Sequence, residues 1–218
     1  MTPANIVGMA MVNGLDLIAL TDHNTCKNCP AFMKMAQAYG ITALPGMELT
    51  TMEEIHVVCL FPSLEDAMAY DAYVEEKSVK FPNDVDIFGK QEIYNEDDEI
   101  IGTIPYYLTN ATEISFDDVY DLVAEYHGIM IPAHIDKTST SLLSQFGFIP
   151  PDSRFTCVEI KDMSHYHALK KQHPYIEKCR IVSNSDAHYL EHIRQPLYTI
   201  DVPDKDPETI LKTLVTPV

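Results

Sequence analysis

The sequence predicts an α/β fold in which short buried strands alternate with helices, and three observations support this prediction. Six short apolar segments have the length and composition of strands, at residues 15–20, 41–44, 55–61, 129–131, 155–160 and 181–183. Helical patterns separate most of them. Polar residues gather at the carboxyl ends of four of these strands, and such ends are where α/β folds hold ligands. We therefore expect a barrel or a strongly curved sheet with one active face.

Capping residues mark the predicted helices. The chain opens on a helix, because Thr2 is a suitable N-cap, Pro3 suits the first helical position and Gly14 is a natural stop. After Cys26–Pro30 a helix is expected through Met33, Met35 and Ala36 that stops near Gly40. The later helices are expected at residues 63–81, 115–128, 175–179 and 206–214, where Ser63, Ser115 and Asp206 precede helical stripes of apolar residues. The sequence thus supplies a helix between most neighbouring strands.

Two segments depart from a simple strand-and-helix alternation. Pro45-Gly46 is expected to break the second strand just before Glu48. Residues 91–94 and 99–104 flank a polar turn and resemble a β-hairpin, which we interpret as an insertion at about 86–112. At 218 residues the chain is long enough for a full hydrophobic core, so we expect a single domain over residues 1–218.

Composition restricts the compartment and the partners. No apolar run reaches the length of a membrane span, the N-terminus lacks the pattern of a signal peptide, and the five cysteines are an odd number. We therefore expect a cytoplasmic protein with reduced thiols and no membrane partner. A formal net charge of −18 disfavours a nucleic acid as a partner. An anionic substrate would need bound cations to approach such a chain.

Imidazoles and carboxylates supply the candidate site at the predicted strand ends. The candidate metal ligands are His23, Glu48, His56, His134, Asp186 and His188. This mixture of donors suits two or three divalent ions of zinc, manganese or iron, and no set of thiolates indicates a structural zinc site. Each residue alone also has an ordinary explanation, such as a hydrogen-bonded histidine in a core strand. Their joint position at strand ends carries the prediction.

Other reactive residues give weaker signals. Asp22 precedes a candidate ligand and could orient it or cap the turn, and Arg194 could contact a phosphate or form a surface ion pair. Cys26-Lys-Asn-Cys29 could be a redox pair, but no thioredoxin-like pattern follows it. We expect the remaining histidines to be structural or exposed.

Five motifs in order resemble those of the polymerase and histidinol phosphatase family, the PHP family of metal-dependent phosphoesterases. The motifs are Thr21-Asp22-His23-Asn24, Pro45-Gly46-Met47-Glu48, Glu54-Ile55-His56-Val57, Pro132-Ala133-His134 and Ser185-Asp186-Ala187-His188. The resemblance implies a distorted seven-stranded β/α barrel with two or three metal ions at its carboxyl face. It also implies that His23 and His188 share one ion, that His56 and His134 hold a second with Glu48, and that Glu48 bridges to a site with Asp186.

The family's first motif, His-x-His on a strand just before the opening helix, is missing from that position, and the only His-x-His in these 218 residues is His165-Tyr166-His167. The missing strand would make seven with the six predicted here. We hypothesise that Met1 is internal and that the natural protein starts upstream. Reading the genomic sequence upstream of the Met1 codon tests this, because a stop codon ahead of any His-x-His would refute it.

The leading functional hypothesis is hydrolysis of a small phosphomonoester by metal-activated water, with Asp22 and Arg194 as tentative catalytic residues. Two alternatives remain open. One is a non-catalytic or truncated metal-binding PHP domain, which the missing first motif suggests. The other is a nuclease acting on DNA ends, which the net charge disfavours.

Overall fold

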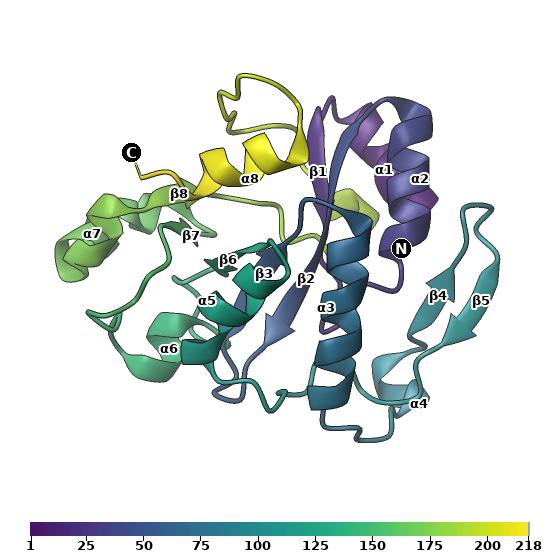
Figure 1. Ribbon diagram of the computed structural model, residues 1–218, viewed down its shortest axis with the longest axis horizontal. Helices are drawn as coiled ribbons and strands as arrows, with labels where there is room; N and C mark the ends of the chain where they lie inside the picture. The colour runs from purple at the N-terminus through teal and green to yellow at the C-terminus, as the bar shows by residue number, and fades with distance from the viewer. Residues whose placement is uncertain (218) are drawn as a thin grey trace.

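The computed structural model describes residues 1–217 as a mixed α/β fold, with strands at the centre and helices around them (Figure 1). The strands are β1 (Leu17–Leu20), β2 (Thr42–Thr50), β3 (His56–Leu60), β4 (Glu92–Tyr94), β5 (Ile100–Thr103), β6 (Ile129–Pro132), β7 (Cys157–Glu159) and β8 (Arg180–Val182). The α-helices are α1 (Pro3–Val12), α2 (Cys29–Tyr39), α3 (Leu64–Lys77), α4 (Val85–Phe88), α5 (Phe116–Glu125), α6 (Leu142–Phe146), α7 (Tyr166–Gln172) and α8 (Pro207–Val215). Short 3₁₀ helices lie at Met163–His165, Pro174–Lys178 and Leu190–His192.

The strands do not close into a barrel within the described residues. The central sheet has the order β1-β2-β3-β6, and β7 pairs with β8 in a separate parallel pair. The pair lies beside β6, where Ile135 N donates to Glu159 O at 2.9 Å. Only β1 and β2 pair in parallel in the central sheet, since β3 runs antiparallel to both of its neighbours. The α/β class is as predicted, whereas the seven-stranded barrel is not observed.

Pro45-Gly46 does not break the second strand, which is a correction to the sequence analysis. β2 continues through both residues and changes partner there: residues 42–45 pair with β1, and residues 46–50 pair with β3. Glycine is required at this point, because a Cβ on Gly46 would lie 2.6 Å from the carbonyl oxygen of Cys59. The dipeptide therefore marks a change of partner within a strand rather than a turn.

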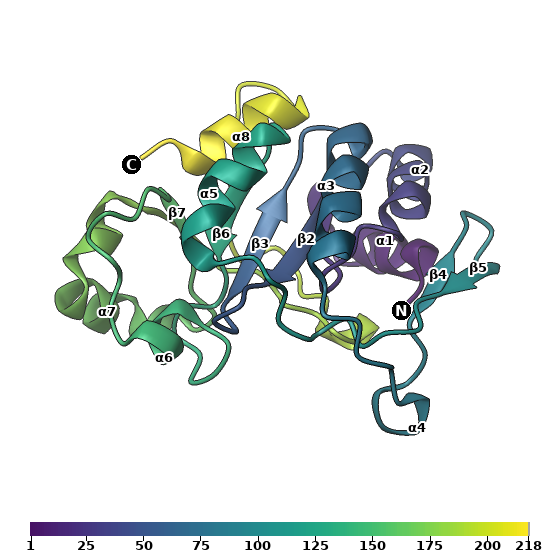
Figure 2. The ribbon, with the colours of Figure 1, turned by 60° about the horizontal axis from the view of Figure 1, so that its bottom comes forward.

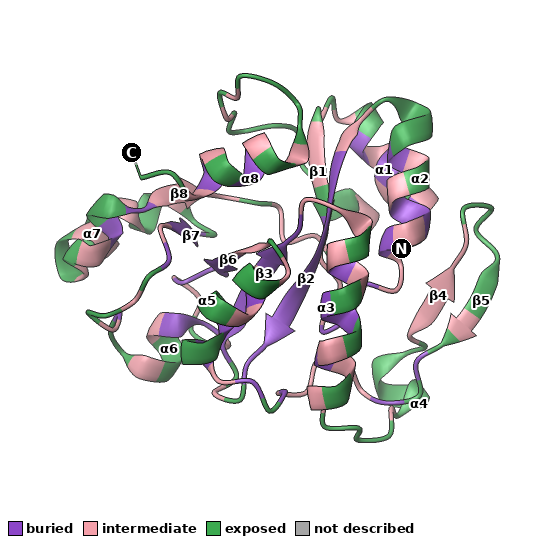
Figure 3. Cartoon of the chain, viewed as in Figure 1, coloured by how far each residue is buried: buried purple, intermediate pink, exposed green. Residues whose placement is uncertain are grey.

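β2 and β3 are largely buried and are drawn mostly in purple in Figure 3, as are β6 and β7. Met47, Leu49 and Val57 are fully buried there and belong to the main hydrophobic core. The first strand was expected to be buried on both faces, but Ala19 in β1 is exposed and only Leu20 is buried. β1 is an edge strand of its sheet, so fewer neighbours cover it.

The predicted caps form as expected. Thr2, Ser63, Ser115 and Asp206 each accept a backbone N–H in the first turn of α1, α3, α5 and α8. The predicted hairpin is present as β4–β5, and Figure 2 shows it at one side of the molecule with α4 below it. The helix expected at residues 175–179 is a 3₁₀ helix instead. Within residues 1–217, every helix is too short or too polar to cross a membrane.

Candidate metal centre

Three imidazoles surround one buried carboxylate. Glu48 Oε1 lies 3.1 Å from His56 Nδ1 and 3.2 Å from His134 Nε2, and Glu48 Oε2 lies 3.4 Å from His23 Nδ1. The Glu48, His56 and His134 side chains are buried, and His23 is about one-fifth exposed. The four residues come from four separate segments of the chain. The fold therefore gathers these predicted ligands in one place.

Asp186 and His188 lie at the open side of this cluster. The ring of His188 is 5.8 Å from that of His23, centre to centre, and its side chain is more than half exposed. Asp186 Oδ1 lies 3.7 Å from His188 Nδ1, and Asp186 has a positive φ of 49° in the loop after β8. All six candidate ligands thus lie in one region that opens to solvent at His188.

Backbone pairing places the first two ligands. His23 forms an isolated parallel bridge with Glu48, so the chain after β1 continues along β2. Asn24 then fixes the turn, because its side chain accepts from Thr50 N at 2.7 Å and donates to the carbonyls of Leu108 and Asn110 at 2.6 and 2.8 Å. The predicted position of Glu48 at a strand end is wrong, since it lies inside β2. Because β3 runs antiparallel, His56 at its start lies beside the end of β2.

A buried acid secures the loop that follows His23. Asp71 on α3 accepts from the Thr25 hydroxyl at 2.9 Å, from Cys26 N at 2.6 Å and from Lys27 Nζ at 2.7 Å. Asp71 is 2% exposed, so its charge is held almost entirely by these donors. Burial opposes the charge on Lys27, but the hydrogen bonds to Asp71 and Glu75 outweigh it and raise the pKa of Lys27. Cys26 and Cys29 in the same loop are buried free thiols.

The donor atoms fit a metal ion. His23 Nδ1, His56 Nε2 and His134 Nδ1 are buried without a hydrogen-bond partner. His23, Glu48 and His56 each offer a ligand atom, and these atoms lie within 4.8 Å of one another. Buried polar atoms without partners are costly, and a divalent cation satisfies imidazole and carboxylate donors together.

Electrostatics keep the donors in the forms that a cation requires. Burial acts to raise the pKa of Glu48, but hydrogen bonds from His134 and His56 outweigh it and hold the pKa well below its usual range. Burial lowers the pKa of His23, against the opposing charge of Glu48. Glu48 is therefore ionised and His23 neutral near pH 7, as metal ligands must be.

Glu159 is a further acid at this site that the sequence analysis missed. It ends β7, is 2% exposed, and its Oε1 has no hydrogen-bond partner. Burial raises its pKa to about 7; the charge of His134 opposes this rise, and those of Glu48 and Asp186 add to it. The sequence signal that could have identified Glu159 is a charged residue near the end of the mostly apolar segment 155–160.

The two tentative catalytic residues lie close to the cluster in sequence but have other partners. Asp22 Oδ2 accepts from Asn28 Nδ2 at 3.1 Å, and burial raises the pKa of Asp22. The Arg194 guanidinium donates to the carbonyl of Asn184. His127, which was expected to be structural or exposed, is three-quarters exposed and pairs with Asp66.

Comparison with known families identifies the family of this chain. A family model described as the PHP domain matches residues 1–206. The chain belongs to the PHP family. PHP proteins are metal-dependent phosphoesterases, in agreement with the resemblance of the five motifs. A comparison with curated proteins gives no match.

Solved structures share the PHP fold at low sequence identity. The lesion-specific endonuclease EndoQ of Pyrococcus furiosus is 18% identical with a TM-score of 0.68, over 98% of this chain and 51% of that protein. A Bifidobacterium adolescentis protein assigned as a metal-dependent phosphoesterase is 16% identical with a TM-score of 0.51, over 98% of this chain and 90% of that protein. Our chain thus spans about half the length of the endonuclease.

A third structure corrects our expectation about partners. Endonuclease Q in complex with a 27-mer duplex, with an abasic lesion at the active site, is 16% identical with a TM-score of 0.57, over 97% of this chain and 51% of that protein. This contradicts our prediction that a nucleic acid is an unlikely partner, which we based on the net charge. Net charge sums over the whole surface, whereas phosphate binding depends on nearby groups and bound cations. The −18 total was therefore a poor guide to the site.

Proposed function

We propose that this chain hydrolyses phosphate esters with the cluster around Glu48 as its metal centre. The observation that carries the proposal is the meeting of His23, His56 and His134 on one buried carboxylate. Divalent cations in such a centre supply hydroxide at neutral pH and neutralise charge on the phosphoryl group. Two or three ions of zinc, manganese or iron suit the six candidate ligands.

The protein's own groups hold and orient the reactants. Glu48 is ionised and would hold the cations together with ring nitrogens of the three surrounding histidines. His188 and Asp186 would complete the donor set on the open side. Asp22, whose pKa is raised, would donate a proton to the leaving oxygen, and Arg194 would bind a phosphate oxygen.

A small phosphomonoester is the first substrate class we propose. The exposed side of His188 leaves the site open to a soluble anion. Cleavage of DNA at a lesion is a second candidate, favoured by the two endonuclease neighbours that cover 98% and 97% of this chain. This chain spans about half the length of those endonucleases.

A substrate panel tests the proposal. The purified chain is loaded with manganese or zinc and assayed on an aryl phosphate, a bis-aryl phosphate and a DNA duplex with an abasic site. We expect phosphate release from the aryl phosphate, and its loss in Glu48→Gln. His127→Ala is the matched control, since that histidine is three-quarters exposed and pairs with Asp66. Absence of turnover on all three substrates in metal-loaded protein would contradict the proposal.

A further inference from the structure

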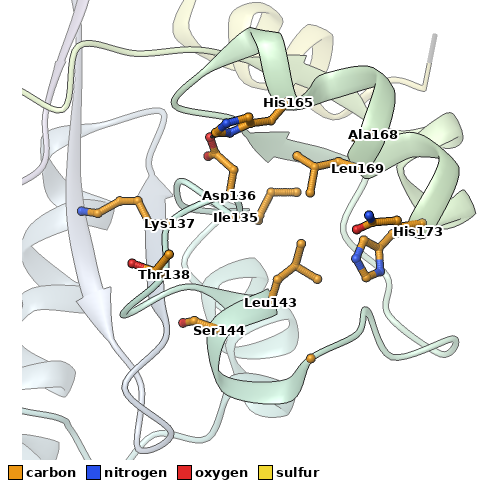
Figure 4. A pocket seen from close by; sticks show the side chains of 12 residues that line it. Ile135, Asp136, Lys137, Thr138, Leu143, Ser144, His165, Ala168, Leu169 and His173 are labelled. Carbon is orange, nitrogen blue, oxygen red and sulfur yellow. Dashed lines mark hydrogen bonds and ion pairs between the residues drawn. The ribbon is translucent and has the colours of Figure 1, made fainter.

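Two lysine ammonium groups lie at the same carboxylate oxygen beside the metal centre. Lys161 Nζ is 2.7 Å and Lys137 Nζ 3.7 Å from Asp186 Oδ2. Lys137 follows β6, Lys161 follows β7 and Asp186 follows β8, so neighbouring strand ends supply all three. Figure 4 shows that the Lys137 side chain points away from the pocket between α6 and α7, toward the central strands.

Hydrogen bonds to the Asp136 side chain tie together the two loops that carry the lysines. Asp136 immediately precedes Lys137, and its carboxylate accepts from the backbone N–H of Lys161 at 2.8 Å and of Asp162 at 2.9 Å. His165 Nδ1 lies 3.0 Å from Asp136 Oδ2, and the Asp136 side chain is 5% exposed. A buried anchor therefore joins the loops that carry the lysines, which distinguishes them from independent surface residues.

The two ammonium groups share one carboxylate, that of Asp186, in a chain that is strongly acidic overall. The neighbouring Asp136 carboxylate is taken up by the backbone N–H groups of Lys161 and Asp162 and by His165. The Lys137 and Lys161 side chains are 33% and 43% exposed, against 11% for Asp186, so solvent reaches the ammonium groups more than the carboxylate between them. Each ammonium group has three N–H donors and keeps some of them free for a second acceptor.

We propose that Lys137 and Lys161 form the binding pair for the phosphate group of the substrate. The proposal rests on the proposed function, because it assigns the groups that hold the phosphate in that site. With a cation held at Asp186, the carboxylate charge would be shared, and the two ammonium groups would be available to phosphate oxygens. The ligand class is a phosphate monoester, or inorganic phosphate as the product.

Titration of inorganic phosphate into metal-loaded protein by calorimetry tests this without turnover. The double variant Lys137→Met/Lys161→Met is compared with Lys170→Met/Lys178→Met, which removes the same charge from exposed lysines of α7 and the adjacent 3₁₀ helix. We expect the dissociation constant for phosphate to rise at least about tenfold in the first variant. In the second it should change less than about twofold.

Further measurements separate the possible outcomes. Metal content is measured first, and only proteins with equal content are compared. The variant Lys161→Arg keeps the charge and should bind phosphate nearly as wild type, which guards against a folding defect in the double variant. Unchanged phosphate affinity in the double variant, or an equal loss in the control, would overturn the proposal. Lysine-dependent phosphate binding in a chain that hydrolyses no ester would support it and reject the proposed function alone.

Discussion

The substitution Glu159→Gln should stabilise the metal-free protein at alkaline pH. Burial raises the pKa of Glu159 from 4.5 to about 7. A carboxyl with a raised pKa favours the folded state fully below its unfolded pKa, and this contribution is lost as the pH rises through the folded pKa. The free-energy cost of burying the ionised carboxylate is then about 1 kcal/mol at about pH 5.5 and about 3 kcal/mol at about pH 8.5. Gln is uncharged and avoids this penalty.

Urea unfolding of both proteins in a chelator, at a series of pH values, measures this effect. The difference in unfolding free energy between Glu159→Gln and wild type should grow by about 2 kcal/mol in favour of the variant between about pH 5.5 and about pH 8.5. Saturating metal should reduce the difference, because a cation near Glu48 and Asp186 offsets the buried negative charge. A difference that is independent of pH would refute the reasoning.

Three other substitutions test separate parts of the structure. His56→Ala should lower the metal content measured by elemental analysis and abolish phosphatase activity, while the circular dichroism spectrum is unchanged; full metal content would contradict its role. Asp71→Asn should lower stability by about 2 kcal/mol in urea, because it weakens the bonds to residues 25–27. Gly46→Ala should cost about 2 kcal/mol or more, because its Cβ would meet a backbone oxygen at 2.6 Å. Gly8→Ala, which has open space, is its control and should cost nothing.

Local signals in the sequence were sufficient for most elements and for the gathering of the candidate ligands. Capping residues such as Ser63 and Ser115 act within one helical turn, so they can be recognised without the fold. His23 and His134 follow predicted strands directly or within a few residues, and the fold brings both of them to Glu48, although Glu48 itself lies inside a strand. Their proximity is an observation, and their role as ligands stays a prediction.

Features that depend on pairing between distant segments escaped the sequence analysis. Pro45-Gly46 resembles a turn locally, yet β1 and β3 pair with its two sides and keep it in one strand. The antiparallel direction of β3, which brings His56 to the cluster, has no local signature either. Glu159 lay unrecognised because only the fold shows which charges surround it. The net charge led to a wrong prediction about partners because it is a sum over the whole chain and does not show where the charges lie.

Anomalous diffraction from crystals of metal-loaded protein tests the central claim most directly. Data collected on both sides of the absorption edge of the added metal locate its ions without reference to activity. We predict a peak within coordination distance of a Glu48 oxygen and of ring nitrogens from His23 and His56. Peaks only elsewhere on the protein, or none at this cluster at saturating metal, would contradict the account.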